Sequence, residues 1–258
     1  MWYSYRVERH KAILEEYKMK IVVCENYEEM SKVGADIIAD LLKGKPDCIL
    51  GLATGSTPVG MYKELIKKNQ AGEITFKNVT SFNLDEYYPL APTHDQSYRY
   101  FMNTNLFDHV DIDKANTNVP DGLAEDPAAM GEAYDAAIEA AGGIDLQVLG
   151  LGPNGHIAFN EPEEELYAGT HLTGLTESTI QANSRFFESI NDVPTQAVTM
   201  GIGSIMKAKK IIVLASGKGK HAVIEKIMSG RITTMCPGTL LLAHADVTLI
   251  VDKDAYEG

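Results

Sequence analysis

The apolar positions of this chain fall into short runs that alternate with longer segments of helical periodicity. A run of four to six apolar residues is typical of a strand buried on both faces, because such a strand has no polar side. The runs predict strands at 20–24, 48–53, 79–83, 144–149, 198–201, 210–215 and 247–252, with a weaker candidate at 170–175.

The segments between these runs carry apolar residues three or four positions apart, which predicts amphipathic helices. The first follows Asn26-Tyr-Glu-Glu29, which has the pattern of a capping box, and should end near Gly44. The second should open at Pro58, with Thr57 as its N-cap. Further helices are expected at 97–107, 126–142, 204–209, 221–228 and 239–244.

Strands that alternate with helices in this way indicate an α/β protein. We expect three layers, with a mostly parallel, doubly wound sheet of roughly six or seven strands between two layers of helices. No repeat, low-complexity segment or linker divides residues 19–258, so we expect a single domain there. Residues 1–18 form an N-terminal extension that is either helical or disordered, and a native or a non-native origin for it stays open.

Composition and charge narrow the class of protein. Hydrophobic residues make up 45% of the chain, enough for a sizeable core. The formal net charge of −13 argues against a nucleic acid or an anionic membrane as partner, but it leaves room for a small phosphorylated molecule.

The three cysteines, Cys24, Cys48 and Cys236, show no C-x-x-C spacing, so we expect reduced thiols in a cytoplasmic protein. No apolar run is long enough for a membrane span, and the N-terminus lacks the apolar core of a signal peptide.

The segment 150–162 holds the strongest candidate for an active site. Several glycines and a proline follow the strand at 144–149, and such a backbone can turn sharply and approach a ligand closely. Asn154, His156 and Glu161 lie in or just after this turn. Because an imidazole gives and takes protons near neutral pH, we expect His156 to be the acid–base centre of the loop.

Three other strand ends are also polar and rich in small residues. Thr54-Gly-Ser-Thr57 has the parts of an anion site, although an ordinary capped turn stays open, and it is neither a P-loop nor a dinucleotide fingerprint. Asp85 and Glu86 form by default a solvated turn, unless one of them points into a ligand crevice. Residues 216–220 place lysines in another such turn. In a doubly wound sheet all four loops can converge on one crevice.

Four motifs together resemble the glucosamine-6-phosphate deaminases: Leu50-Gly-Leu-Ala-Thr-Gly-Ser-Thr-Pro58, Ser81-Phe-Asn-Leu-Asp-Glu-Tyr87, Gly152-Pro-Asn-Gly-His-Ile-Ala-Phe-Asn-Glu-Pro162 and Ala182-Asn-Ser-Arg-Phe-Phe187. The resemblance extends over about residues 20–252, in order. The third motif is the most specific, because the related 6-phosphogluconolactonases share its Gly-His turn but not its Phe-Asn-Glu-Pro continuation. The resemblance implies a modified Rossmann-like fold, conversion of glucosamine 6-phosphate and water to fructose 6-phosphate and ammonia, and no organic cofactor or metal.

The resemblance also implies a role for each catalytic residue. His156 would open the sugar ring, and Glu161 would orient the imidazole and tune its protonation. Asp85, rather than Glu86, would carry the C2 proton to C1. Some members have an aspartate at the position of Asn154; since an amide does not titrate, Asn154 can only hold geometry here. The substrate phosphate would be bound by Thr54, Gly55, Ser56, Thr57, Arg185 and Lys218.

Allosteric members of the family bind N-acetylglucosamine 6-phosphate through basic and hydroxyl residues soon after the His156 loop. The matching positions here are Glu164, His171, Thr173 and Gly174, which do not suit a phosphate. We therefore expect hyperbolic kinetics without that activator, and a monomer or a small homo-oligomer.

Other functions stay open at this point. A lactonase acting on 6-phosphogluconolactone is the nearest enzyme alternative, and the Phe159-Asn-Glu161 continuation and Asp85 speak against it. Galactosamine 6-phosphate differs from the glucosamine sugar in the orientation of one hydroxyl, so it also stays open as a substrate. A non-catalytic sugar-phosphate sensor is a third possibility; the acidic charge and the lack of a helix-turn-helix segment argue against it.

Overall fold

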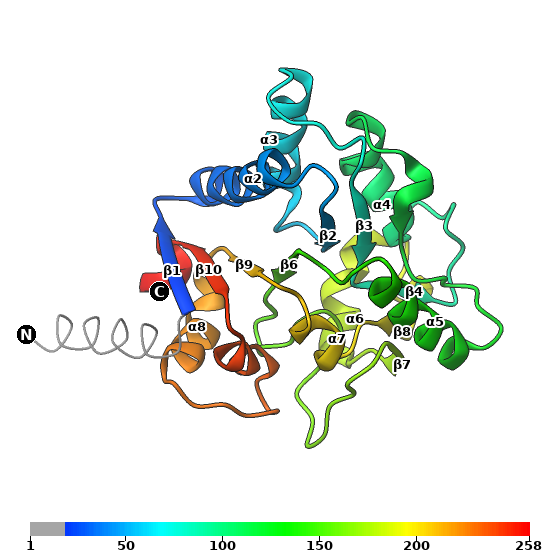
Figure 1. Cartoon of the computed structure of the whole chain (residues 1–258). Helices are drawn as coiled ribbons and strands as arrows, with labels where there is room; N and C mark the ends of the chain where they lie inside the picture. The colour runs from blue at the N-terminus through cyan, green and yellow to red at the C-terminus, as the bar shows by residue number, and fades with distance from the viewer. Residues whose placement is uncertain (1–18) are drawn as a thin grey trace, which may run out of the picture.

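The computed structural model describes residues 19–258, apart from the side chains at 178, 182 and 186, so the expectations for residues 1–18 lie outside the described residues. Its centre is a parallel sheet of seven strands, in the order β1-β10-β9-β6-β2-β3-β5 (Figure 1). These strands are β1 (Met19–Cys24), β2 (Ile49–Leu52), β3 (Thr80–Asn83), β5 (Thr117–Asn118), β6 (Leu146–Gly150), β9 (Ile211–Ala215) and β10 (Val247–Asp252).

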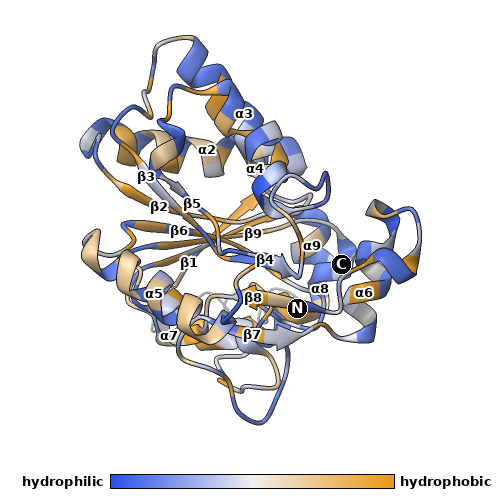
Figure 2. Ribbon diagram, turned by 90° about the vertical axis from the view of Figure 1, so that its right-hand side faces the viewer, coloured by the Kyte–Doolittle hydropathy of each residue, from blue (hydrophilic) through white to orange (hydrophobic). Residues whose placement is uncertain are grey.

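Helices cover both faces of this sheet, as Figure 2 shows edge on. One face carries α2 (Tyr27–Gly44), α3 (Val59–Gln70) and α4 (Tyr98–Asn105), and the other α5 (Pro127–Ala140), α7 (Ile202–Met206) and α8 (His221–Met228). The chain also contains α6 (Glu177–Asn183), α9 (Lys253–Glu257) and short 3-10 helices at Phe107–His109, Lys114–Asn116, Ser184–Phe186, Ile190–Asp192, Lys218–Lys220 and Pro237–Ala243. The three-layer α/β prediction is confirmed.

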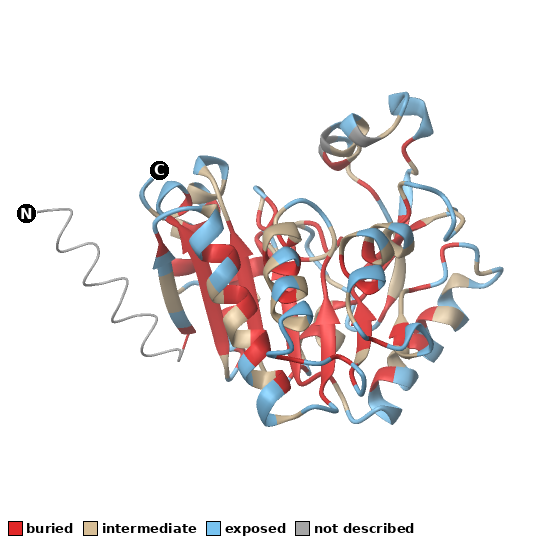
Figure 3. Cartoon of the chain, turned by 90° about the horizontal axis from the view of Figure 1, so that it is seen from above, coloured by how far each residue is buried: buried red, intermediate tan, exposed pale blue. Residues whose placement is uncertain are grey.

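The core lies between the sheet and its helices, and the buried residues in Figure 3 follow the strands. Every residue of β9 and β10 is buried, which accords with the apolar run of β9 and the mostly apolar β10. Cys24, Cys48 and Cys236 are free and buried within this core. Among the described helices, none combines the length and the apolar character that a membrane crossing would need.

A second, antiparallel sheet corrects the strand assignment. It consists of β4 (Asp85–Tyr88), β8 (Gln196–Thr199) and β7 (His171–Gly174), in the order β4-β8-β7. The expected strands at 170–175 and 198–201 therefore exist but do not join the parallel sheet. Only Leu84 separates β3 from β4, so the chain leaves the main sheet at this residue and pairs with β8. Apolar runs indicate a strand but not its partner, which depends on distant segments.

The direction of the chain reverses between β2 and β6. From β2 it continues to β3 on one side, and from β6 it passes to β9 on the other, while β2 and β6 pair with each other in parallel. Ligands of doubly wound sheets bind outside the carboxyl ends of strands at such a switch point. The loops that begin at Ala53 and Leu151 lie at this position.

The start of α3 differs from the prediction. Thr57 is not its N-cap; the helix begins at Val59 after Pro58, with no side-chain cap. Tyr27 of α2 takes over this role. Its hydroxyl lies 3.1 Å from the carbonyl oxygens of Ser56 and Thr57, and it accepts a hydrogen bond of 2.8 Å from the N–H of Gly60. A side chain from another helix thereby holds the turn, which local sequence cannot show.

Two predicted helix starts are accurate in different degrees. The helix expected from residue 126 begins at Pro127, and the side chain of Asp126 caps it. The side chain of Asn26 accepts from the N–H of Glu29, but the Glu29 carboxylate accepts from Glu25 rather than from Asn26, so only half of the capping box forms.

Replacing Tyr27 with phenylalanine removes the hydroxyl that ties the turn before α3 to α2. We expect Tyr27→Phe to lower the free energy of unfolding by about 0.5–1.5 kcal/mol, since partly buried backbone groups lose their partner. Urea denaturation measures the change. Tyr100→Phe is the matched control, because this ring is 41% exposed, and equal effects of the two variants would contradict the prediction.

Candidate active site

A cavity of about 540 Å³ opens at the carboxyl ends of β2, β3 and β6. All four polar loops reach it: three form its walls, and the fourth, at 216–220, contributes one lysine. Of the predicted site residues, the cavity is lined by Thr54, Gly55, Ser56, Thr57, Asp85, Asn154, His156 and Arg185.

A hydrogen-bonded network connects the three polar residues of the His156 loop. The imidazole Nδ1 of His156 lies 3.2 Å from Oε1 of Glu161. The side-chain amide of Asn154 donates to Oε2 of Glu161 at 2.6 Å, and its carbonyl accepts from the backbone N–H of His156 at 3.1 Å. Thr179 of α6 donates its hydroxyl to Oε1 of Glu161 at 2.7 Å. Sequence analysis missed Thr179, which belongs to no motif.

This network decides the charge of Glu161, which is 5% exposed. Burial opposes ionisation, but the contact with His156 and the hydrogen bonds from Thr179 and Asn154 outweigh it and lower the pKa of Glu161 to about 2. Glu161 is therefore an anion at neutral pH. The side chain of His156 keeps 24% of its surface exposed, so the imidazole can exchange protons with a ligand in the cavity while Glu161 stays behind it.

Glycines let the His156 turn fold this tightly. A Cβ on Gly152 would lie 2.5 Å from the imidazole ring of His156, so the ring rests directly on this glycine. Gly155 has a φ of +94°, and a Cβ there would lie 2.3 Å from Sγ of Cys236. The N–H of Gly238 donates to the carbonyl of Gly155 at 2.7 Å and thereby holds the turn in place.

Asp85 enters the cavity from β4 and is not a solvated turn residue. Its side chain is 6% exposed, and that of Glu86 is 1% exposed. Burial, and then the negative charge of Glu86, raise the pKa of Asp85 to about 8. A carboxylate with a raised pKa is a stronger base than one at its ordinary value, which suits abstraction of a proton from carbon.

The turn after β2 forms another wall of the cavity. Gly55 has a φ of +87°, so the backbone reverses at a residue without a side chain. Thr54, Gly55, Ser56 and Thr57 all reach the cavity, and Arg185 faces it from the 3-10 helix at Ser184–Phe186. Hydroxyls, turn amides and a guanidinium around one space can bind an anion.

The lysine of the fourth loop is a different one from that expected. Lys218 is exposed and is not part of the cavity wall, whereas Lys220 lines it. Burial lowers the pKa of Lys220. The loop before it turns at Gly217, whose N–H donates to Asp252 at the end of β10. Both lysines belong to the same short turn, so the sequence indicates the loop but not which of its lysines points inward.

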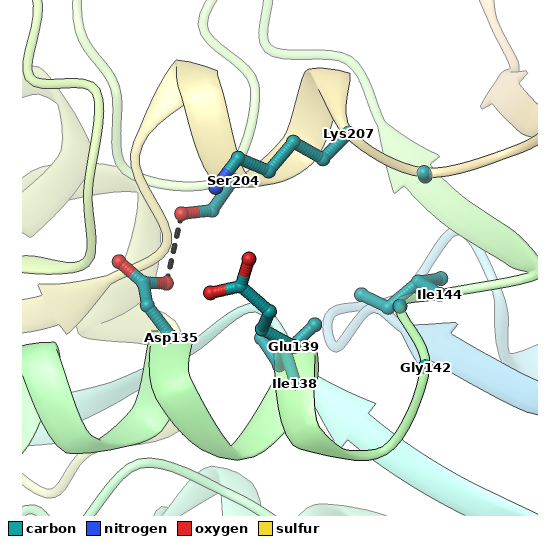
Figure 4. A pocket seen from close by; sticks show the side chains of 9 residues that line it. Asp135, Ile138, Glu139, Gly142, Ile144, Ser204 and Lys207 are labelled. Carbon is teal, nitrogen blue, oxygen red and sulfur yellow. Dashed lines mark hydrogen bonds between the residues drawn. The ribbon is translucent and has the colours of Figure 1, made fainter.

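A second cavity, of about 300 Å³, lies at the opposite end of β6, between α5 and α7 (Figure 4). Asp135 there accepts hydrogen bonds from Ser204 and from both the N–H and the hydroxyl of Thr170, so its carboxylate is occupied in joining three elements. Across residues 19–258, the structure groups no three His, Cys, Asp or Glu side chains that could hold a metal ion.

An imidazole–carboxylate pair, a buried carboxylate and a turn of amides and hydroxyls lie together at the switch point of a doubly wound sheet, and such groups can carry out acid–base chemistry on a small anionic ligand. Comparison with known proteins specifies the class further. The chain belongs to the glucosamine-6-phosphate isomerase/6-phosphogluconolactonase family, whose model matches residues 25–250.

Relatives with known names lie on the deaminase side of this family. A glucosamine-6-phosphate deaminase of Clostridium perfringens is 63% identical over 237 residues, 92% of this chain and 98% of that protein. A solved structure of a monomeric glucosamine-6-phosphate deaminase matches with a TM-score of 0.90 and 43% identity, over 93% of this chain and 99% of the other. The 6-phosphogluconolactonase of Trypanosoma cruzi shares the fold, with a TM-score of 0.76 at 22% identity over 94% of this chain and 97% of the other.

The raised pKa of Asp85 makes stability depend on pH. In the unfolded chain this carboxyl titrates near 4, so the folded state binds the extra proton between about pH 4 and pH 8. Its contribution to stability is therefore complete below pH 4 and is lost as the pH rises to 8. We expect Asp85→Asn, which cannot titrate, to lose less stability than the unmodified chain from pH 5 to pH 8.5. Urea midpoints at both pH values measure this, and a parallel decline of the two proteins would refute the sign.

Proposed function

We propose that this chain is a glucosamine-6-phosphate deaminase, which converts glucosamine 6-phosphate and water to fructose 6-phosphate and ammonia. The observation that carries the proposal is that Asp85 of β4 and His156 of the loop after β6 face one cavity, with Glu161 behind the imidazole. Isomerisation of an amino sugar needs both an acid–base group for the ring oxygen and a base for the carbon chain. The deaminase names of close relatives support the same activity.

His156 opens the pyranose ring. It takes the proton of the anomeric hydroxyl and delivers a proton to the ring oxygen, so the C1–O5 bond breaks and an aldehyde forms at C1. The anionic Glu161 stabilises the imidazolium that exists between these two transfers. Asn154 keeps the imidazole in place through the backbone of His156 and through Glu161, and it does not change charge itself.

Asp85 then transfers the proton on carbon. Its carboxylate removes the C2 proton while the ammonium group of the substrate passes a proton to the C1 oxygen, so an enolamine forms, and the same carboxyl then returns its proton to C1. Water adds to the resulting iminium at C2, and ammonia leaves as the ketone forms. In the empty cavity the high pKa of Asp85 favours its neutral form. The positively charged amino group of the substrate, bound nearby, favours the ionised base, so the base is charged when the substrate is present.

The phosphate is bound at the other end of the cavity by Thr54, Gly55, Ser56, Thr57 and Arg185. Lys220 completes this site, because it lines the cavity and Lys218 does not. Burial lowers the pKa of Lys220, and a phosphate dianion beside it favours the ammonium form again. A planar guanidinium and a compact ammonium then share the charge of the phosphate.

The proposal also includes the reaction class, the cellular location, the oligomeric state and the kinetics of the enzyme, which membership of the family does not specify. Net hydrolysis of a C–N bond makes the enzyme a hydrolase in overall balance, and the three free cysteines support a cytoplasmic location. The solved relative is monomeric by its name, which supports a monomer or a small homo-oligomer. In the segment matched to the allosteric residues, the ring of His171 stacks on that of Tyr167, with 4.3 Å between ring centroids. Hyperbolic kinetics without the activator stays a prediction.

Ammonia release on glucosamine 6-phosphate tests the proposed function. We expect turnover by the unmodified chain, and a loss of at least about 100-fold in kcat for Asp85→Asn and for His156→Gln, since each removes a proton carrier. A coupled assay for ammonia measures it. Binding of the sugar phosphate without turnover would favour a sensor, and turnover of 6-phosphogluconolactone instead would favour the lactonase alternative.

The two lysines of the 216–220 turn make a matched pair for the phosphate site. We expect Lys220→Ala to raise KM for glucosamine 6-phosphate about tenfold or more, because a charge-assisted contact contributes about 1.5–3 kcal/mol. Lys218→Ala should leave KM within about twofold, since this side chain is exposed and outside the cavity wall. Steady-state kinetics of both variants gives the comparison, and the reverse order would assign the phosphate contact to Lys218.

A further inference from the structure

Glu86 is a buried carboxylate next to the proposed base, and the mechanism above does not use it. It is 1% exposed and follows Asp85 directly in β4. Because successive side chains of a strand point to opposite faces, Glu86 points away from the cavity that Asp85 enters, and it does not line that cavity. A buried acid in such a position needs partners for its oxygens.

Two of the three partners belong to the start of α4. Oε1 of Glu86 accepts hydrogen bonds from the N–H of Tyr98 at 2.8 Å and of Tyr87 at 2.9 Å, and Oε2 accepts from the N–H of Arg99 at 2.9 Å. Tyr98 and Arg99 are the first two residues of the helix, and Ser97 caps the third N–H in the usual way. The glutamate therefore occupies the positive end of the helix, as a bound anion would.

The start of α4 places an aromatic side chain in the wall of the active-site cavity. Tyr98 lines this cavity, and its ring stacks on Phe159 of the His156 loop, with 6.1 Å between centroids and an interplanar angle of 8°. It also packs against Tyr87, with 4.7 Å between centroids. Glu86 is thus the hydrogen-bonded link between β4, which carries Asp85, and the helix whose first residue contacts the loop of His156.

We propose that Glu86 is a positioning residue of this active site, which fixes the start of α4 with Tyr98 against Phe159 and places a buried negative charge beside Asp85. The inference rests on the proposed deaminase function, because it assigns Asp85 as the base. Neither the hydrogen bonds nor the burial of Glu86 is needed for the strand pairing of β4, which uses the backbone.

The charged and titratable groups around Glu86 determine how its ionisation changes the pKa of Asp85. Burial raises the pKa of Glu86 to about 7, although the three N–H groups and then the guanidinium of Arg99 oppose this rise. Arg99 itself is directed to Thr117, to whose hydroxyl and carbonyl it donates. The other titratable groups facing Glu86 are Asp85 and the hydroxyls of Tyr87 and Tyr98. Burial raises the pKa values of the two tyrosines well beyond neutral pH. Near neutral pH, ionisation of Glu86 therefore changes mainly the pKa of Asp85.

Two variants separate the effect of the charge of Glu86 from the effect of its side-chain length. Glu86→Gln keeps the length, removes the charge and leaves one oxygen that can still accept from the N–H of Tyr98, although its NH2 group cannot accept from Arg99. Glu86→Asp keeps the charge and shortens the side chain by one methylene. We expect Glu86→Gln to move the acidic limb of the kcat/KM profile to lower pH by about one unit, because Asp85 loses a neighbouring anion. Glu86→Asp should leave that limb in place and raise KM several-fold, because Tyr98 loses its anchor.

Asp145→Asn is the matched control. Asp145 is also a buried carboxylate that accepts from lysines and from a backbone N–H, but it lies before β6, at the end of the sheet away from the cavity. We expect Asp145→Asn to lower the unfolding temperature without moving the acidic limb. Thermal unfolding of all variants corrects each rate for the folded fraction.

The possible outcomes separate this inference from the proposed function. If Glu86→Gln and Asp145→Asn share the acidic limb of the unmodified chain, Glu86 has only a structural role and the inference is wrong, while the deaminase function stands. A shift of the limb in Glu86→Gln alone, with the larger rise in KM in Glu86→Asp, supports it. Lack of ammonia release by the unmodified chain would overturn the proposed function and the inference together.

Discussion

The parallel pairing of β2 with β6 is the contact on which the site depends. Leu50 pairs with Leu146 and Gly51 with Gln147, and the chain leaves the two strands in opposite directions. Gly51 leaves room for the side chain of Gln147, whose oxygen would lie 2.0 Å from a Cβ at this position. Both the turn at Thr54–Thr57 and the His156 loop begin where these strands end, so the register of one strand pair sets their separation.

Three carboxylates close to the cavity differ in their protonation because their partners differ. Glu161 receives hydrogen bonds from Thr179 and Asn154 and lies beside His156, so its pKa falls although it is buried. Asp85 is buried next to another acid, so its pKa rises. Glu86 has backbone donors and still titrates above its ordinary range, because burial prevails. The same side-chain chemistry thereby yields a fixed anion, a strong base and a helix anchor.

The outline of the fold and most of the site could be predicted from the chain alone. Apolar runs located β9 and β10, and the glycines around His156 located the tightest turn. The second sheet could not be found this way, since the strand at 171–174 pairs with residues more than twenty positions later. The cap of α3 was mispredicted for a similar reason: a tyrosine of α2 supplies it. Hydrogen-bond partners from distant segments override local preference.

The sequence by itself determined the α/β class, the four polar loops and the residue types of an acid–base and anion site, because these follow from periodicity and from side-chain chemistry. Only the tertiary structure decided which carboxylate faces the cavity and which anchors a helix, since Asp85 and Glu86 are adjacent and differ only in the face of β4 from which they project. It likewise placed Lys220, and not Lys218, in the wall of the cavity, because the direction of a side chain in a turn depends on the backbone around it.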